Sequence, residues 1–257
     1  MFREYHKKTN ITFSEDETLV NYFQMKYWTF DEARSSGSLS DEIYTLNMIA
    51  VQSAEATRWP GAWAEGDYPF MQVMLGTSID MYGEELFLKA TIGNLTFDGV
   101  DSDLLHMGDI GGELGDMIQN SIPFDRFGWF YQRNESETYD GEFQMHTGVD
   151  DIYKVGQISK WKNMSDLSQF YPEDCGQLTG SAGEFFPQDR DKTSLSYFTP
   201  DLCRPIHFNF KEESEVMGIS GYKYVLDEGF IGNSSTNSSN WCYNPHLDFS
   251  KFLQQDQ

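Results

Sequence analysis

The spacing of apolar residues changes twice along the chain. At 2–44 and again at 119–243 apolar side chains recur mainly at every second position, whereas at 45–118 they recur with the spacing of a helix. Alternation indicates strands that bury one face, and a period of 3.6 residues indicates amphipathic helices. The pattern therefore predicts an α+β fold with a large, mainly antiparallel β-core and a helical part.

The amino-terminal residues predict a pair of strands. Ile11 and Phe13 precede an acidic turn at 14–17, and Tyr22 follows the turn in the same alternating pattern. Residues 33–41 are rich in Ser and contain Gly, which is typical of a loop.

Three helices are expected in the middle section. The first spans 46–57 and ends before Trp59-Pro60-Gly61, because proline cannot continue a helix. The second spans roughly 68–82, and the third spans 110–119. The apolar face of the first helix would consist of Leu46, Ile49, Ala50, Ser53, Ala54 and Thr57.

The segment 127–151, FGWFYQRNESETYDGEFQMHTGVDD, predicts a β-hairpin. Aromatic residues alternate over 127–132, which favours a first strand. The polar stretch 135–141 ends in Asp-Gly, a common hairpin turn, and Phe143 and Met145 alternate on the return strand. Further strands are expected after this hairpin, at 195–198 and 206–210, followed by a polar linker at 233–240.

Composition and charge narrow the class of protein. The chain has 257 residues, of which 39% are hydrophobic and 16% aromatic, so it can bury a substantial core. Its net charge is −23, with 41 acidic residues, which argues against nucleic acid and against simple adhesion to anionic lipid surfaces. No apolar run is long enough for a transmembrane helix, and the first residues are too polar for a signal peptide.

Glycosylation motifs nevertheless favour an exported chain. Six Asn-x-Ser/Thr motifs occur, several of them in polar, turn-like segments. An exported chain without an export signal suggests a piece of a longer protein. The six acceptor residues are Asn10, Asn94, Asn134, Asn163, Asn233 and Asn237.

The three cysteines are Cys175, Cys203 and Cys242. In an oxidising compartment an odd count leaves one thiol without a partner in the chain. Their spacing matches no zinc pattern, and three buried free thiols remain an alternative.

No catalytic or cofactor chemistry is indicated. Adjacent carboxylates such as Asp150-Asp151 and Glu84-Glu85 would point to opposite faces of a strand, so they do not form a catalytic pair. The five histidines are scattered, and no Gly-x-Ser-x-Gly motif occurs. Residues 98–103 resemble a calcium loop, but they lack its spacing and its downstream Glu, which favours a plain acidic turn. The Gly-rich segment 178–187 lacks the Gly-Lys-Ser/Thr of a phosphate loop. We expect neither an enzyme nor a bound metal or cofactor.

Several motifs resemble the class B scavenger receptors, two-pass membrane receptors for lipids and lipoproteins. The resemblance covers most of 2–243, which implies that 244–257 would be a divergent tail and that the domain would be incomplete at both ends. Its strongest motifs are Phe127-Gly-Trp-Phe-Tyr-Gln-Arg133-Asn134, His146-Thr-Gly148-Val-Asp150-Asp151, Lys154-Val-Gly156-Gln-Ile158, Trp161 and Asp201-Leu-Cys203-Arg204.

The resemblance implies a single ectodomain fragment. Core strands at 2–44 and 119–243 would form a barrel-like core, and 45–118 would form a helical cap at one end. A tunnel through the core would carry fatty acids, sterols or carotenoids, and lipoprotein particles would be further ligands. The full-length protein would lie in the plasma membrane or an endolysosomal membrane, anchored by segments absent from this chain, with this region extracellular or lumenal.

The same resemblance implies roles for particular residues. Cys175 would pair with Cys242, and Cys203 would stay single because its partner lies beyond Gln257. The cap would dock ligands, including proteins, near Asp80, Met81, Tyr82, Glu84 and Glu85. These acidic residues disfavour polyanionic ligands. An adhesion or recognition ectodomain without lipid transfer, which binds apoptotic cells, pathogens or protein cargo, remains the alternative, because the sequence cannot separate core residues from residues that line a cavity.

Overall fold

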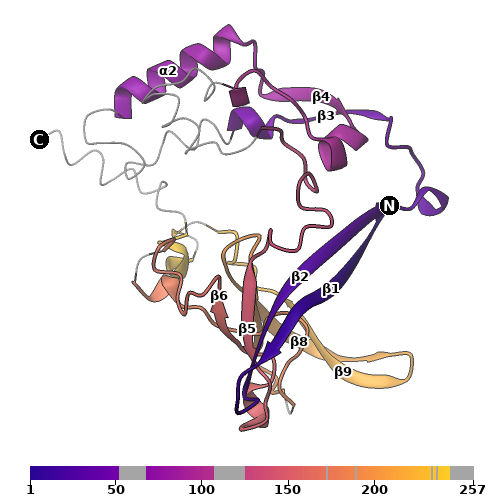
Figure 1. The fold of residues 1–257 in the computed structure, drawn as a ribbon, viewed down its shortest axis with the longest axis vertical. Helices are drawn as coiled ribbons and strands as arrows, with labels where there is room; N and C mark the ends of the chain where they lie inside the picture. The colour runs from indigo at the N-terminus through magenta and orange to yellow at the C-terminus, as the bar shows by residue number, and fades with distance from the viewer. Residues whose placement is uncertain are drawn as a thin grey trace, which may run out of the picture. The chain divides into compact units, whose positions relative to one another are not determined.

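The computed structural model describes residues 1–51, 68–106, 125–171, 173–188, 190–232, 234–235 and 237–243 (Figure 1). The chain folds as two compact units. The first unit comprises 1–5 and 26–136, and the second comprises 6–25 and 137–257.

The strands form three separate antiparallel sheets, which confirms the mainly antiparallel character expected from the sequence. A four-stranded sheet has the order β1-β2-β5-β6, a two-stranded sheet pairs β3 with β4, and a three-stranded sheet has the order β7-β8-β9. Within the described residues these sheets stay open, so the barrel-like closure is not seen there. The strand bounds are β1 Phe2–Phe13, β2 Leu19–Phe30, β3 Glu42–Leu46, β4 Phe87–Thr91, β5 Glu142–His146, β6 Ile158–Trp161, β7 Ser194–Thr199, β8 Arg204–Val216 and β9 Ile219–Leu226.

The amino-terminal hairpin follows the predicted pattern. Figure 1 shows β1 and β2 as two long paired strands joined by the short acidic turn. In that turn the Asp16 carboxylate accepts hydrogen bonds from the Ser14 and Thr18 hydroxyls at 2.7 and 2.9 Å. These bonds hold the turn closed and hold the pKa of Asp16 below its usual value.

The core of the second unit is built from aromatic and aliphatic residues of several strands. Tyr22 of β2 and Phe143 of β5 stack at a ring distance of 5.5 Å. The Trp161 indole N–H donates to the Asp140 carbonyl at 2.7 Å, which satisfies its buried polar atom. The buried members of this cluster are Tyr22, Phe143, Ile158, Trp161, Leu167 and Phe198.

Residues 127–132 do not form the expected strand, so this prediction is wrong. Only Phe127 makes a β-bridge, to Val100, and the following residues form successive turns. The Phe130 amide donates to the Thr96 carbonyl, and Gln132 has a φ of 55°, outside the strand region. The hairpin partner of β5 is therefore absent, and β5 pairs with β2 and β6 instead.

Aromatic packing within the first unit explains the misleading pattern. The Phe130 ring stacks on Trp28 at 4.7 Å and contacts Phe97 and Phe2 at 5.4 and 5.5 Å. In addition, the Asn134 side-chain oxygen accepts the Trp28 amide at 2.8 Å. Phe130 therefore packs in an aromatic cluster with Trp28, Phe97 and Phe2, and does not lie on one face of a strand.

One of the three helices expected from the sequence lies almost wholly within the described residues. Helix α2, Tyr68–Met81, confirms the helix expected at 68–82. Helical residues begin at 48, so Leu46 was wrongly assigned to a helix; it ends β3 and pairs with Phe87 of β4. Residues 52–67 and the helix expected at 110–119 lie outside the described residues.

Candidate functional site

The glycine-rich turn at 178–187 lies between two sheets of the second unit. The Ile158 amide of β6 donates to the Gly180 carbonyl at 2.9 Å, and the Ser181 amide donates to the Ser196 carbonyl of β7 at 2.9 Å. The Ser181 hydroxyl donates to the Phe185 carbonyl at 2.6 Å, which closes the turn on itself. The turn thus connects β6 to β7 through backbone hydrogen bonds.

Two glycines, Gly156 and Gly180, allow the glycine-rich turn to lie close to the backbone of its neighbouring segments. Gly156 has a φ of 75°, and a Cβ atom there would lie 2.2 Å from the Phe185 carbonyl oxygen. Gly180 has a φ of 92°, and a Cβ atom there would lie 2.6 Å from the Ser196 hydroxyl oxygen. Both positions demand a left-handed backbone and leave no room for a side chain.

A cavity of about 490 Å³ lies beside this turn, within the size range of small-molecule sites. Its wall combines apolar side chains from β6, the turn and β7 with hydroxyl groups. The lining residues are Gln157, Ile158, Leu178, Thr179, Gly180, Ser181, Phe186, Pro187, Arg190, Ser194, Leu195, Ser196 and His207.

The described lining residues of this cavity include a cation and no carboxylate, although the chain carries 41 acidic side chains. The nearest described carboxylate in sequence is Asp191, whose pKa is lowered by hydrogen bonds from Thr193 and, in part, by the charge of Arg190. Arg190 is its permanent cation, and the Arg190 Nε atom is buried and makes no hydrogen bond to the described chain. Partial burial and the nearby Arg204 lower the pKa of His207 below its ordinary value, so His207 is mostly neutral at pH 7. The described wall therefore offers one permanent cation and several hydroxyl groups beside its apolar side chains.

The outer side of the turn is held to β1. The Lys8 ammonium lies 2.8 Å from the Glu184 carboxylate and 3.9 Å from the centre of the Tyr22 ring. Burial and the Glu184 charge raise the pKa of Tyr22, so its hydroxyl stays protonated. These contacts connect the turn to the buried core of the four-stranded sheet.

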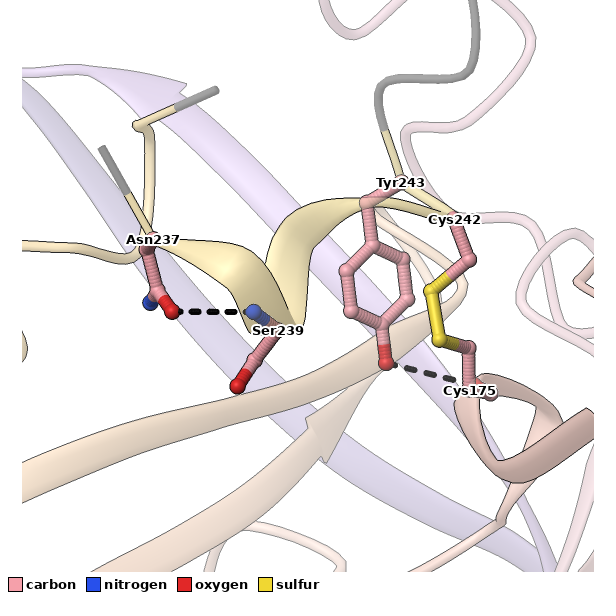
Figure 2. The surroundings of a disulfide bond; sticks show 5 residues. All are labelled: Cys175, Asn237, Ser239, Cys242 and Tyr243. Atoms are coloured by element: carbon pink, nitrogen blue, oxygen red, sulfur yellow. Dashed lines mark hydrogen bonds between the residues drawn. A yellow bond between two sulfur atoms is a disulfide. The ribbon is translucent and has the colours of Figure 1, made fainter. Parts of the chain in front are cut away.

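A disulfide joins the residues just before the glycine-rich turn to the carboxyl-terminal end of the described chain (Figure 2). Cys175 and Cys242 are bonded, with their Cα atoms 6.4 Å apart. Next to them the Tyr243 hydroxyl donates to the Cys175 carbonyl at 3.2 Å. The Asn237 side chain accepts the Ser239 amide at 3.1 Å and begins a short 3-10 helix, Ser238–Asn240.

Arg204, the first residue of β8, contacts Phe230 and Tyr243 near the disulfide. Its guanidinium lies 3.8 Å from the centre of the Phe230 ring and 4.0 Å from that of Tyr243, so it is sandwiched between two aromatic rings. It also donates to the Phe230 carbonyl at 3.1 Å. Burial lowers the pKa of Arg204 without removing its charge.

Cys203 is a free thiol and half-buried. Its Sγ donates to the Pro200 carbonyl at 3.3 Å, and burial raises the pKa of the thiol. Burial and a raised pKa keep this thiol unreactive at neutral pH.

The residues expected at the ligand-docking surface do not share one environment. Glu84 accepts the Asn47 side-chain amide at 2.6 Å and also bonds the Ser102 hydroxyl. Asn47 is buried and caps the helical turn after it by accepting the Ile49 amide, so Glu84 supports the fold. Asp80, Met81, Tyr82 and Glu85 are exposed at and after the end of α2.

The sequence argument missed the cavity completely. Arg190 and His207 carry no motif, and the lining residues extend from 157 to 207, so only folding brings them together.

The open antiparallel sheets, the glycosylation motifs and the disulfide are those of an exported or lumenal β-rich domain. The CD36 family model matches residues 1–253, and the chain belongs to this family, the class B scavenger receptors. No helix in the described ranges is both long and apolar enough to cross a bilayer.

Three relatives illustrate the match. Protein peste of Drosophila melanogaster is 29% identical over 94% of this chain and 41% of its own length. Scavenger receptor class B member 1 of Bos taurus is 25% identical over 95% of this chain and 45% of its own length. Lysosome membrane protein 2 of Rattus norvegicus is 26% identical over 92% of this chain and 46% of its own length. The chain therefore spans less than half of the curated relatives it matches.

Proposed function

We propose that this chain is the ectodomain portion of a non-catalytic receptor that binds and transfers lipids at a plasma or endolysosomal membrane. In this proposal 2–44 and 119–243 belong to a core around a lipid tunnel, 45–118 form a cap that docks lipoprotein or protein ligands, and 244–257 are a divergent tail. The observation that carries the proposal is the cavity beside the glycine-rich turn, found in a member of a receptor family.

The cavity favours a fatty acid over a neutral ligand. Ile158, Leu178 and Leu195 offer apolar surface to an acyl chain, while Arg190 offers a cation to a carboxylate. A hydrogen bond to a charged group contributes about 1.5–3 kcal/mol, so Arg190 would dominate the discrimination between an acid and its ester.

Arg190→Gln is expected to weaken oleate binding by at least about tenfold. Oleate affinity is measured by displacement of a fluorescent fatty acid from the delipidated chain. Oleate methyl ester should bind the variant and the original chain equally, because it lacks the carboxylate. Lys154→Gln, which removes a positive charge outside the cavity, serves as the matched control. Equal oleate affinity in both variants would reject the role of Arg190.

An adhesion ectodomain is the second candidate. The exposed acidic and apolar residues after α2, Asp80, Met81, Tyr82 and Glu85, favour a cationic protein ligand. If the delipidated chain shows no saturable fatty acid or sterol binding, lipid transfer is rejected and adhesion is favoured.

We expect unequal use of the glycosylation motifs in an exported chain. Asn94 and Asn163 are exposed and should carry glycans, whereas Asn10 is exposed but donates its side-chain amide to the Glu137 carboxylate at 3.1 Å and should be occupied less completely than those two. Asn237 donates its side-chain amide to the Gly229 carbonyl at 3.3 Å, and the Asn134 side-chain oxygen accepts the Trp28 amide. These two asparagines should therefore be glycosylated less completely. Asn233 lies outside the described residues.

The measurement is enzymatic deglycosylation in heavy-oxygen water followed by peptide mass spectrometry. Asparagine converted to labelled aspartate marks each occupied site. Full occupancy at Asn237 together with none at Asn163 would contradict the expected order.

A further inference from the structure

The β8–β9 hairpin projects beyond the rest of its sheet. Figure 1 shows this ribbon as the long yellow-orange extension of the second unit. From Lys211 to Lys223 every residue except Ser214 is exposed, so both faces of the ribbon meet solvent. Its register pairs Val216 with Ile219, and Met217 and Gly218 form a two-residue turn with φ values of 51° and 79°. Positive φ at both positions gives a tight turn that matches the twist of the strands.

The tip of this hairpin is apolar. Val216, Met217 and Ile219 are 67%, 99% and 74% exposed, and no charged residue occurs from 216 to 222. Single exposed apolar residues are ordinary, whereas three at the end of one narrow projection indicate a contact surface.

Ion pairs neutralise much of the flanking charge. Glu212 lies 3.0 Å from Lys223, and Glu213 lies 2.5 Å from Lys192 on the neighbouring strand end. These pairs reduce the repulsion that the acidic strand would otherwise meet near a lipid surface. Neither pair includes Glu215, which is exposed directly before Val216, so the ribbon from Lys211 to Lys223 keeps a net charge of −1, from two lysines and three glutamates.

We propose that the hairpin tip, Val216–Ile219, inserts into the outer or lumenal leaflet of a lipid bilayer. A protein interface needs on the order of 1,000 Å² with aromatic or Arg anchors, and this narrow aliphatic tip offers neither. A bilayer needs no complementary shape, because aliphatic side chains gain free energy wherever they leave water. The membrane location rests on the proposed function, whereas the tip lies outside the cavity.

The overall charge defines which bilayer should be used. With a net charge of −23 the chain is repelled by anionic lipids, so zwitterionic phosphatidylcholine vesicles are the appropriate partner. Because the contact is hydrophobic, raised salt should leave binding unchanged or strengthen it.

The test is flotation of the full chain with phosphatidylcholine vesicles. Met217→Asp and Ile219→Asp are expected to reduce the vesicle-bound fraction at least about tenfold, because each places a charge in the leaflet. Asp is well tolerated at the positive φ of Met217, so this variant should fold. Val149→Asp and Ile231→Asp change residues that are 66% and 81% exposed elsewhere in the second unit, and they should float like the original chain.

A second readout locates the tip. Met217→Trp should show a blue-shifted emission that grows with added vesicles, whereas Val149→Trp should not shift. Failure of the original chain to float, or equal flotation of tip and control variants, would overturn the proposal. Oleate affinity, measured without vesicles, should be unchanged in the tip variants, so the outcome is independent of whether the cavity binds fatty acid.

Discussion

Loss of the Cys175–Cys242 disulfide is expected to lower the free energy of unfolding of the second unit by about 4 kcal/mol. The bond closes a loop with a sequence separation of 67 residues, and opening it restores conformational entropy to the unfolded chain. It also releases Tyr243, whose ring stands against Arg204 and Tyr171. The double variant Cys175→Ser/Cys242→Ser avoids leaving a single reactive thiol, and urea unfolding followed by tryptophan fluorescence gives the free energy.

Cys203→Ser is the matched control for this experiment. It removes a half-buried thiol with one weak hydrogen bond, so the free energy of unfolding should fall by about 1 kcal/mol or less. Non-reducing peptide mapping of the original chain should find Cys175 joined to Cys242 and Cys203 free. A Cys175–Cys203 peptide, or an equal loss of stability in the two variants, would contradict the expected result.

Gly156→Ala is expected to destabilise the second unit by about 3 kcal/mol. An L-residue at a φ of 75° costs about 1–2 kcal/mol, and the new methyl group would lie 2.2 Å from the Phe185 carbonyl oxygen. To relieve the clash, the glycine-rich turn must move away from β6. Because the turn forms one wall of the cavity, oleate affinity should fall together with stability.

Gly183→Ala separates the two contributions. Its φ is 105°, but the nearest atom to an added Cβ would be a Tyr197 ring carbon at 3.8 Å, an ordinary contact. Only the backbone cost remains, so the loss should be about 1 kcal/mol. If Gly156→Ala and Gly183→Ala lower the free energy of unfolding equally, the short distance between Gly156 and Phe185 does not contribute to the loss of stability.

Regular elements were predictable where the local pattern and the packing agreed. The alternation around the acidic turn predicted the β1–β2 hairpin, and the spacing over 68–82 predicted α2. The strands expected at 195–198 and 206–210 correspond to β7 and β8. In each case the backbone satisfies its hydrogen bonds within the element or with a neighbour in sequence.

The segment 127–132 shows where local pattern reasoning fails. Its aromatic alternation is as clear as that of a strand, but its amides at 129 and 130 bond the carbonyls of Leu95 and Thr96. Phe130 then fills the space between Trp28 and Phe97. A partner far away in sequence outweighed the local preference, and a single sequence does not reveal that partner.

The sequence by itself determined the family and the antiparallel character of the strands. These follow from ordered motifs and from residue periodicity, neither of which depends on the spatial arrangement of remote segments. Only the tertiary structure decided that Glu84 supports Asn47 and that Arg190 lines the same cavity as His207. The reason is physical: burial and the local charge around a residue depend on distances between segments remote in sequence, which are established only when the sheets assemble.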